Sequence, residues 1–309
     1  MDNAIVTGAT GMLGLALMRL LVSRGVNVYA VVNPGSARIG NIPQDARIKV
    51  IYCGLDEIER LPDMINDKCE AFFHFAWGGT FGDSRNDMEA QIANIYSSVK
   101  AASAAAKLGC GTFLGAGSQA EYGRKVTPVS PDMPAFPENG YGMAKLCAGQ
   151  MTREICRRNG VKHIWCRIFS VYGPFDGEKT MVMSGISKLL NGERPQYTRG
   201  EQQWDYLYCD DAARAFWLAA EKGRDGSVYC VGSGTTRPLM DYIKLLRDET
   251  CPGAEIGLGE IPYAEKQVMY LCADISSLTA DTGFVPEISF EEGIKRTVEF
   301  VRRNRSGRS

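Results

Sequence analysis

Apolar residues occur along the first half of the chain in short runs, separated by longer amphipathic stretches. The runs predict strands at residues 4–6, 26–32, 47–52, 71–76, 112–114 and 161–168. The stretches between them have the composition of helices, notably 86–108 and 141–158, and another follows the first strand as far as Arg24. Strands that alternate with helices predict an α/β fold, a doubly wound parallel sheet with helices on both faces.

Sheets of this kind bind ligands at the carboxyl ends of their strands. Five residues that suit ligand binding follow the predicted strands, namely Gly8, Asn33, Trp77, Ser118 and Ser170. We therefore expect one edge of the sheet to carry the functional site.

The segment TGATGMLG, residues 7–14, joins the first strand to the first helix. Its glycines allow a tight turn and a close approach to a pyrophosphate, whose charge the N–H groups and the positive end of the helix would bind. The order of strand, glycine turn and helix predicts a dinucleotide-phosphate site. The expected contacts are Gly8, Thr10, Gly11, Met12 and Leu13.

The regular alternation of predicted strands and helices ends after Tyr172. Helices at 180–190 and 210–222, with short strands at 196–198 and 204–208, predict a smaller mixed α/β subdomain towards the C-terminus. We expect residues 1–172 to form a dinucleotide-binding domain, with 205–232 crossing back to it. Residues 173–204 and 233–309 would then form mainly a substrate-binding subdomain, of which 304–309 look like a loose polar tail.

Composition narrows the function classes. The 309 residues are 45% hydrophobic and 23% charged, which suits one large or two closely packed domains. The 35 basic and 36 acidic residues give no net attraction to a nucleic acid polymer or a membrane surface. No apolar run is long enough for a membrane span, and the first strand begins too early for a signal peptide, so we expect a cytoplasmic protein.

The cysteines and histidines do not suggest a metal site. The ten cysteines are scattered singly, which is typical of reduced, mostly buried side chains. The two histidines, His74 and His163, lack neighbouring ligands at metal-binding spacing, and we expect both to be structural.

Tyr141 and Lys145 stand four residues apart at the start of a predicted helix, and therefore share a face. A lysine ammonium beside a phenol favours the phenolate, which predicts a lowered pKa for Tyr141. The same lysine can hold a cofactor ribose. An ordinary surface pair on a helix remains the alternative for an isolated match of this kind.

The ordered set of motifs resembles the extended branch of the short-chain dehydrogenase/reductase superfamily, the NAD-dependent epimerase/dehydratase family that acts on nucleotide sugars. The motifs are TGATGMLG, HFAW at the fourth strand, Asn94 in the long helix, GSQAEYG around Ser118, YGMAK, RIFSVYGP, WDYLYCDDAARA and the terminal GFVPEISFEEGI. The resemblance covers nearly the whole chain. It implies a Rossmann-like fold and a homodimer that pairs the helices at 86–108 and 141–158.

The resemblance also implies catalytic roles. Ser118 would hydrogen-bond the substrate carbonyl or carbinol oxygen, and Tyr141 would exchange its proton while a nicotinamide exchanges hydride. Lys145 would complete the catalytic group, and Asn94 would support its architecture.

Departures from the family pattern narrow the expected reaction. Dehydratases of the family carry an acidic pair immediately after the serine or threonine, where this chain has Gln119 and Ala120, and the 3,5-epimerase/reductases carry a cysteine at position 120. What remains is redox at one carbon: a 4-keto reductase is favoured, and a 4-epimerase is the alternative. A catalytically silent dinucleotide-binding regulator is a third interpretation, which the presence of all three catalytic residues disfavours.

The cofactor prediction depends on the end of the second strand. NAD enzymes place an acid there for the ribose 2′-OH, whereas this chain has Asn33 with Arg38 nearby, which suits the 2′-phosphate of NADP(H). NAD(H) stays possible, since Arg38 could equally be a solvated loop charge. Gly54 replaces the usual adenine-binding Asp and leaves Leu55 to pack the ring. Further expected cofactor contacts are Phe75, Ala76, Trp77, Ala116, Tyr141, Lys145 and Ile168.

The expected substrate is a nucleotide-diphosphate sugar. Ser170 replaces the family's usual Asn, and Trp204 replaces an Arg that commonly contacts the diphosphate, so Lys179, Arg194 or Arg199 could supply charge instead. The predicted substrate contacts are Trp77, Thr80, Ser118, Gln119, Ser170, Lys179, Arg199 and Trp204.

Overall fold

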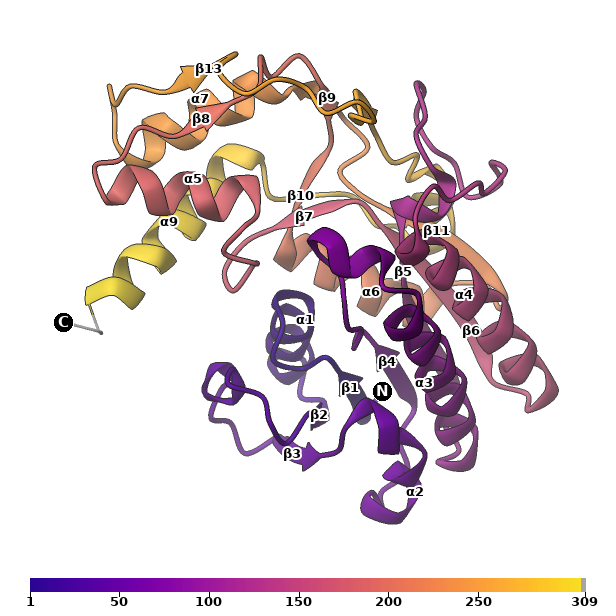
Figure 1. The fold of residues 1–309 in the computed structure, drawn as a ribbon. Helices are drawn as coiled ribbons and strands as arrows, with labels where there is room; N and C mark the ends of the chain where they lie inside the picture. The colour runs from indigo at the N-terminus through magenta and orange to yellow at the C-terminus, as the bar shows by residue number, and fades with distance from the viewer. Residues whose placement is uncertain (307–309) are drawn as a thin grey trace.

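The computed structural model describes residues 1–306. Seven parallel strands form the central sheet in the spatial order β11-β6-β5-β4-β1-β2-β3 (Figure 1). They are β1 (Asn3–Thr7), β2 (Asn27–Val32), β3 (Ile48–Tyr52), β4 (Ala71–His74), β5 (Thr112–Ser118), β6 (Lys162–Ile168) and β11 (Ser227–Val231). The predicted doubly wound, Rossmann-like α/β fold is confirmed.

Helices cover both faces of the sheet (Figure 1). Ala4 and Val6 of β1 belong to a core cluster with residues of α1 and α6, whereas Ile5 belongs to a second cluster with residues of α3 and α4. This alternation follows from the pleat, because successive side chains of a strand point to opposite faces. The helices are α1 (Met12–Ser23), α2 (Leu61–Met64), α3 (Met88–Lys107), α4 (Gly140–Arg158), α5 (Met181–Leu190), α6 (Cys209–Lys222), α7 (Leu239–Thr250), α8 (Ser276–Thr282) and α9 (Phe290–Ser306).

Strand β5 is longer than the sequence pattern predicts. It continues beyond Leu114 to Ser118, which is therefore the last residue of the strand rather than the first after it. Gly115 and Gly117 look like a break in the sequence, but a Cβ at either position would overlap the ring of Trp165 on the neighbouring β6. The two glycines thus admit a buried tryptophan at the end of the strand that carries Ser118.

After leaving the central sheet at the end of β6, the chain returns to it with α6 and β11. Strand β11, which the sequence analysis did not predict, pairs with β6, and α6 packs against α1. The remaining strands form small sheets: β7 (Ser170–Tyr172) with β10 (Tyr206–Tyr208), β9 (Gln203–Trp204) with β12 (Arg237–Pro238) and β14 (Tyr270–Leu271), and β8 (Gln196–Tyr197) with β13 (Gly257–Leu258). This pairing supports our division into a domain of 1–172 with 205–232 and a substrate subdomain, which remains a prediction.

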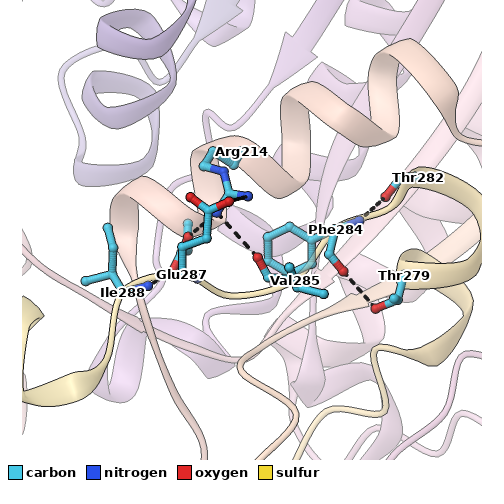
Figure 2. A network of polar contacts seen from close by, with 8 residues as sticks. Arg214, Thr279, Thr282, Phe284, Val285, Glu287 and Ile288 are labelled. Carbon is cyan, nitrogen blue, oxygen red and sulfur yellow. Dashed lines mark hydrogen bonds and ion pairs between the residues drawn. The ribbon is translucent and has the colours of Figure 1, made fainter.

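A polar network fastens the segment before α9 to α6. Figure 2 shows Arg214 of α6 directed at Glu287 and at the carbonyl of Val285. The carboxylate of Asp211 also accepts the N–H groups of Glu287 and Ile288 at 3.0 and 2.8 Å. The GFVPEISF motif therefore anchors the C-terminal segment to α6.

The expected loose tail is partly wrong. Helix α9 continues to Ser306, and Arg305 donates to the carbonyl and the hydroxyl of Ser187 at 3.1 and 2.9 Å. These bonds hold the last turn against α5, whereas positions 307–309 of the predicted tail lie outside the described residues. Every helix within 1–306 is too short or too polar to span a lipid bilayer.

Candidate active site

The glycine turn after β1 has the geometry of an anion site. Gly8 has φ +69°, and a Cβ there would stand 2.8 Å from the amide of Ala76. A Cβ at Gly14 would overlap the carbonyl oxygen of Gly8. Gly11 caps α1 without a side-chain hydrogen bond, and the first turn of α1, which starts at Met12, contains no acid. The N–H groups of this turn are therefore free of local anions, and the residues present fit a dinucleotide pyrophosphate.

The loop after β2 is shaped by its own polar side chains. The side-chain oxygen of Asn33 accepts the N–H of Gly35 at 2.9 Å, and Thr10 and Ser36 approach hydroxyl to hydroxyl at 3.5 Å. Arg38 is exposed. The structure thus brings Thr10 and the Asn33 loop together, while Leu55 begins the 3-10 helix η2 (Leu55–Arg60) after β3.

Ser118, Tyr141 and Lys145 come together at the end of β5 and the start of α4. Asn139 caps α4 by accepting the N–H of Gly142 at 2.8 Å, and a Cβ at Gly142 would overlap the carbonyl oxygen of Ala120. The glycine therefore lets α4 approach the end of β5 closely. Ser118 lies close enough to the Tyr141 hydroxyl to oppose the rise in the pKa of the phenol.

Lys145 is almost completely buried, with 3% of its surface exposed. Its Nζ donates to the carbonyl of Ala116 at 2.7 Å and lies 3.7 Å from the centre of the Trp77 ring. Burial lowers the pKa of Lys145 to about 7, against the opposing attraction of Glu121. Ala116, Trp77 and Lys145, all predicted cofactor contacts, are therefore neighbours.

The expected lowering of the Tyr141 pKa is wrong. Burial raises the pKa of the phenol, and the hydrogen bond to Ser118 and the charge of Arg85 oppose this effect without overcoming it. Lys145 Nζ lies 5.8 Å from the centre of the Tyr141 ring, farther than the guanidinium carbon of Arg85 at 4.6 Å. The cation closest to the tyrosine ring is thus one that the sequence analysis overlooked.

Trp77 links Tyr141 and Lys145 to α3. Its ring stands edge-on to Tyr141, with 6.2 Å between centroids, and its Nε1 donates to Gln91 at 2.9 Å. Asn94 holds the next residue, because its amide group accepts the N–H of Gly78 and donates to its carbonyl, both at 2.9 Å. The support predicted for Asn94 is visible here as a clamp on the loop after β4.

The protein resembles known proteins over its whole length. The model of the NAD dependent epimerase/dehydratase family matches residues 4–232, about three quarters of the chain. The chain belongs to this family. The dTDP-glucose 4,6-dehydratase of Streptomyces antibioticus is 24% identical over 315 residues, covering 98% of this chain and 93% of that relative.

Two solved structures of the family share the fold. The UDP-glucose 4-epimerase of Thermotoga maritima, solved with UDP-glucose, superposes with a TM-score of 0.88 at 27% identity, covering 98% of this chain and 99% of the other. The dTDP-glucose 4,6-dehydratase of Streptomyces venezuelae, solved with NAD and TYD bound, gives a TM-score of 0.87 at 20% identity, with coverage of 99% and 98%.

Glu121 is a feature of this family member that the sequence analysis missed. Its side chain is fully buried, and one oxygen accepts the N–H of Ser118 at 2.8 Å and Nε1 of Trp165 at 3.0 Å. The other oxygen accepts Nε of Arg167 at 2.6 Å. A charged residue between Ala120 and Tyr122 was the available signal, since its neighbours are buried and apolar.

The predicted substrate residues divide into two groups. In the first group, Gln119 lies beside Ser118 at the start of η4 (Gln119–Tyr122). Ser170 pairs with Tyr206 across the β7–β10 ladder. Ile168, a predicted cofactor contact, ends β6 two residues before Ser170. Thr80, Lys179 and Arg199 are exposed on loops.

Two of the positions considered for the diphosphate are already engaged or buried. Arg194 is held by Glu260 with contacts of 2.8 and 2.5 Å, so its charge is committed to an ion pair. Trp204 pairs with Arg237 and Leu271 in its small sheet, and its Nε1 is buried with no hydrogen-bond partner within residues 1–306.

The segment after β7 contains a third overlooked feature. Phe175 has φ 68°, a conformation that is rare for a residue with a side chain. The adjacent Asp176 accepts the Gly177 N–H at 2.7 Å and the Thr180 hydroxyl at 3.0 Å, and burial raises its pKa to about 6. The turn GPFD that links β7 to α5 is thus a fixed conformation.

Both histidines are buried in the protein, which fits the structural role predicted for them. His74 lies between Thr7 Oγ1 at 2.9 Å and Ser98 Oγ at 3.1 Å, and burial lowers its pKa to about 3. His163 contacts Thr152 at 3.0 Å. All ten cysteines are unpaired, eight of them buried, and residues 1–306 contain no cluster of metal-ligating side chains.

Proposed function

We propose that the protein is an NAD(P)-dependent nucleotide-sugar oxidoreductase, and specifically a 4-keto reductase of a nucleotide-activated deoxysugar. One observation carries the choice among the reactions of the family. The acid next to the catalytic group, Glu121, is fully buried and bound by Arg167, Trp165 and the backbone of Ser118. It is therefore unavailable to remove water from a sugar, and Gln119 and Ala120 offer no substitute.

The catalytic side chains suit reduction of a carbonyl group. When bound, the nicotinamide supplies the hydride that adds to the carbonyl carbon. The hydroxyl of Ser118 donates a hydrogen bond to the carbonyl oxygen, and Tyr141 transfers its phenolic proton to the same oxygen, which becomes the alcohol. The raised pKa of Tyr141 keeps its proton in place at neutral pH, as a proton donor requires.

For the cofactor we propose NADP(H) rather than NAD(H). Position 33 carries no negative charge, and Arg38 is exposed and outside any ion pair found in residues 1–306. A guanidinium in that position can bind a 2′-phosphate in bidentate fashion. The bound NAD in the dehydratase structure from Streptomyces venezuelae supports NAD(H) as the alternative.

For the ligand contacts we propose the residues predicted from the sequence. Gly8, Thr10, Gly11, Met12 and Leu13 would hold the pyrophosphate, and Trp77, Gln119 and Ser170 would line the sugar. The exposed Lys179 and Arg199 would supply positive charge for the nucleotide diphosphate.

A 4-epimerase is the second candidate. The observation in its favour is the similarity to the UDP-glucose 4-epimerase of Thermotoga maritima, at 27% identity over nearly the whole chain. Such an enzyme oxidises and re-reduces the same carbon, so it gains by keeping its cofactor bound through the cycle.

We further propose a homodimer through α3 and α4, which pack side by side. Met88, Ile92 and Tyr96 form an exposed stripe four residues apart on α3, and Met143 and Met151 are exposed on α4. An apolar stripe of this kind on adjacent helices suits an isologous four-helix interface.

Incubation with a nucleotide-diphosphate 4-keto-6-deoxysugar and reduced cofactor tests the function. The proposal predicts oxidation of the cofactor in step with the loss of the keto sugar. Interconversion of nucleotide hexoses without net oxidation of the cofactor would instead establish the epimerase.

A further inference from the structure

Arg85 belongs to the 3-10 helix η3 (Gly82–Asn86), which follows β4 and precedes α3. Its backbone position is fixed from two sides. Gln91 donates to the carbonyls of Gly79 and Ser84 at 2.9 and 3.1 Å, and the side chain of Asn86 accepts the N–H of Gly140 at 3.0 Å. This short helix therefore docks on the start of α4, one residue before Tyr141.

The side chain of Arg85 lies over the catalytic tyrosine. Its guanidinium carbon is 4.6 Å from the centre of the Tyr141 ring, within the range of a cation–π contact. Its Nε is buried and has no hydrogen-bond partner, and within residues 1–306 no carboxylate stands at ion-pair distance from Arg85. The positive charge is thus directed at Tyr141 without being neutralised.

The other groups around Tyr141 cannot replace this charge. Lys145, on α4 itself, is farther from the ring, and its Nζ is directed at the carbonyl of Ala116 and the ring of Trp77. Glu121, behind β5, is an anion that disfavours the phenolate, and Ser118 contributes only a neutral hydrogen bond. His74 on β4 is neutral because its pKa is about 3. Arginine stays protonated at every accessible pH.

We propose that Arg85 is a positioning residue for Tyr141: its guanidinium holds the ring against Trp77 and stabilises the phenolate that forms when the tyrosine gives up its proton. The inference rests on the proposed function only in taking Tyr141 as the proton donor. It adds a permanent cation on the loop after β4 to the serine, tyrosine and lysine.

The test measures the ionisation of Tyr141 directly and needs no substrate. A difluorinated tyrosine, whose hydroxyl is more acidic than that of tyrosine, is placed at position 141 alone, and its fluorine NMR shift is followed against pH. An opposite charge at this distance shifts a pKa by about one unit or more. Arg85→Met should therefore raise the midpoint by about one pH unit, and Arg85→Lys should keep it within about half of that shift.

The control is Arg157→Met, which removes an arginine that pairs with Glu154 more than four helical turns farther along α4 and should leave the midpoint unchanged. An unchanged midpoint in Arg85→Met, or equal shifts in the methionine and lysine variants, would overturn the inference. Circular dichroism of each variant checks that the fold is retained. A shifted midpoint in a protein that fails to reduce 4-keto sugars would retain the role of Arg85 and reject the proposed reaction.

Discussion

Glu121 and Arg167 form an ion pair of 2.6 Å inside the protein, and both side chains are almost completely buried. The pair joins η4 to β6 directly beside Ser118, whose N–H binds the same carboxylate. A charge that is paired and hydrogen-bonded on all sides is a structural element, and its removal leaves the partner charge uncompensated.

Replacing Glu121 should therefore destabilise the fold. We expect Glu121→Gln to lower the free energy of unfolding by about 3–5 kcal/mol, because it leaves a buried guanidinium without a counter-charge. Urea titration measures this loss. Glu154→Gln is the matched control, since Glu154 pairs with Arg157 and Arg158 in solvent and its replacement should cost far less stability. Equal losses in the two variants would show that the buried pair contributes no more to the free energy of unfolding than the exposed pair does.

The buried ammonium group of Lys145 should lower the free energy of unfolding. Its pKa of about 7 in the folded protein lies below the 10.5 of an ordinary lysine, so the unfolded chain binds more protons between these two pH values. The penalty is largest below pH 7 and fades as the pH rises towards 10.5. Lys145→Met should raise the unfolding free energy at pH 6 by about 1–3 kcal/mol, and the gain should shrink by pH 10.

Thermal unfolding of both proteins across this pH range checks the prediction for Lys145. A gain that is constant with pH, or a loss at pH 6, would contradict it.

The proposed dimer predicts a variant that dissociates. Ile92 is 63% exposed on α3, and a charge there would be buried against its symmetry mate. Ile92→Glu should halve the mass measured by light scattering at micromolar concentration. Val126→Glu, which changes an exposed apolar residue away from α3 and α4, should keep the dimer mass. A wild-type protein of monomer mass would remove the proposal.

Cofactor preference should follow the loop after β2. Asn33→Asp would repel a 2′-phosphate and accept the ribose 2′-OH, so it should shift preference towards NADH by about 1–3 kcal/mol. Arg38→Ala should weaken the binding of NADPH more than that of NADH. Direct titration of both cofactors measures these changes, and tightly held NAD in the purified wild type would favour the epimerase instead.

The parallel sheet and the grouping of Ser118, Tyr141 and Lys145 could be predicted because they depend on local signals. The glycine turn, the apolar runs and the spacing of Tyr141 and Lys145 are all readable within short windows. The end of β5 was harder to predict from the sequence, because Gly115 and Gly117 make room for Trp165, some 50 residues later in the chain.

The electrostatics of the site could not be predicted from spacing. Lys145 shares a helix face with Tyr141, yet burial lowers its pKa, and its Nζ is turned towards Ala116 and Trp77. Arg85, far from the YGMAK motif in sequence, reaches Tyr141 only because η3 docks on α4. Both effects depend on tertiary contacts that no local pattern carries.

The most direct test of the central claim follows one hydride. Reduced cofactor that carries deuterium at the transferred position is incubated with the protein and a nucleotide-diphosphate 4-keto-6-deoxysugar, and the product is analysed by NMR. The account predicts one deuterium at sugar C4 for each cofactor oxidised, and a fall of at least ~10²-fold in turnover for Tyr141→Phe. Unlabelled product formed without net cofactor oxidation, or unchanged turnover in Tyr141→Phe, would contradict it.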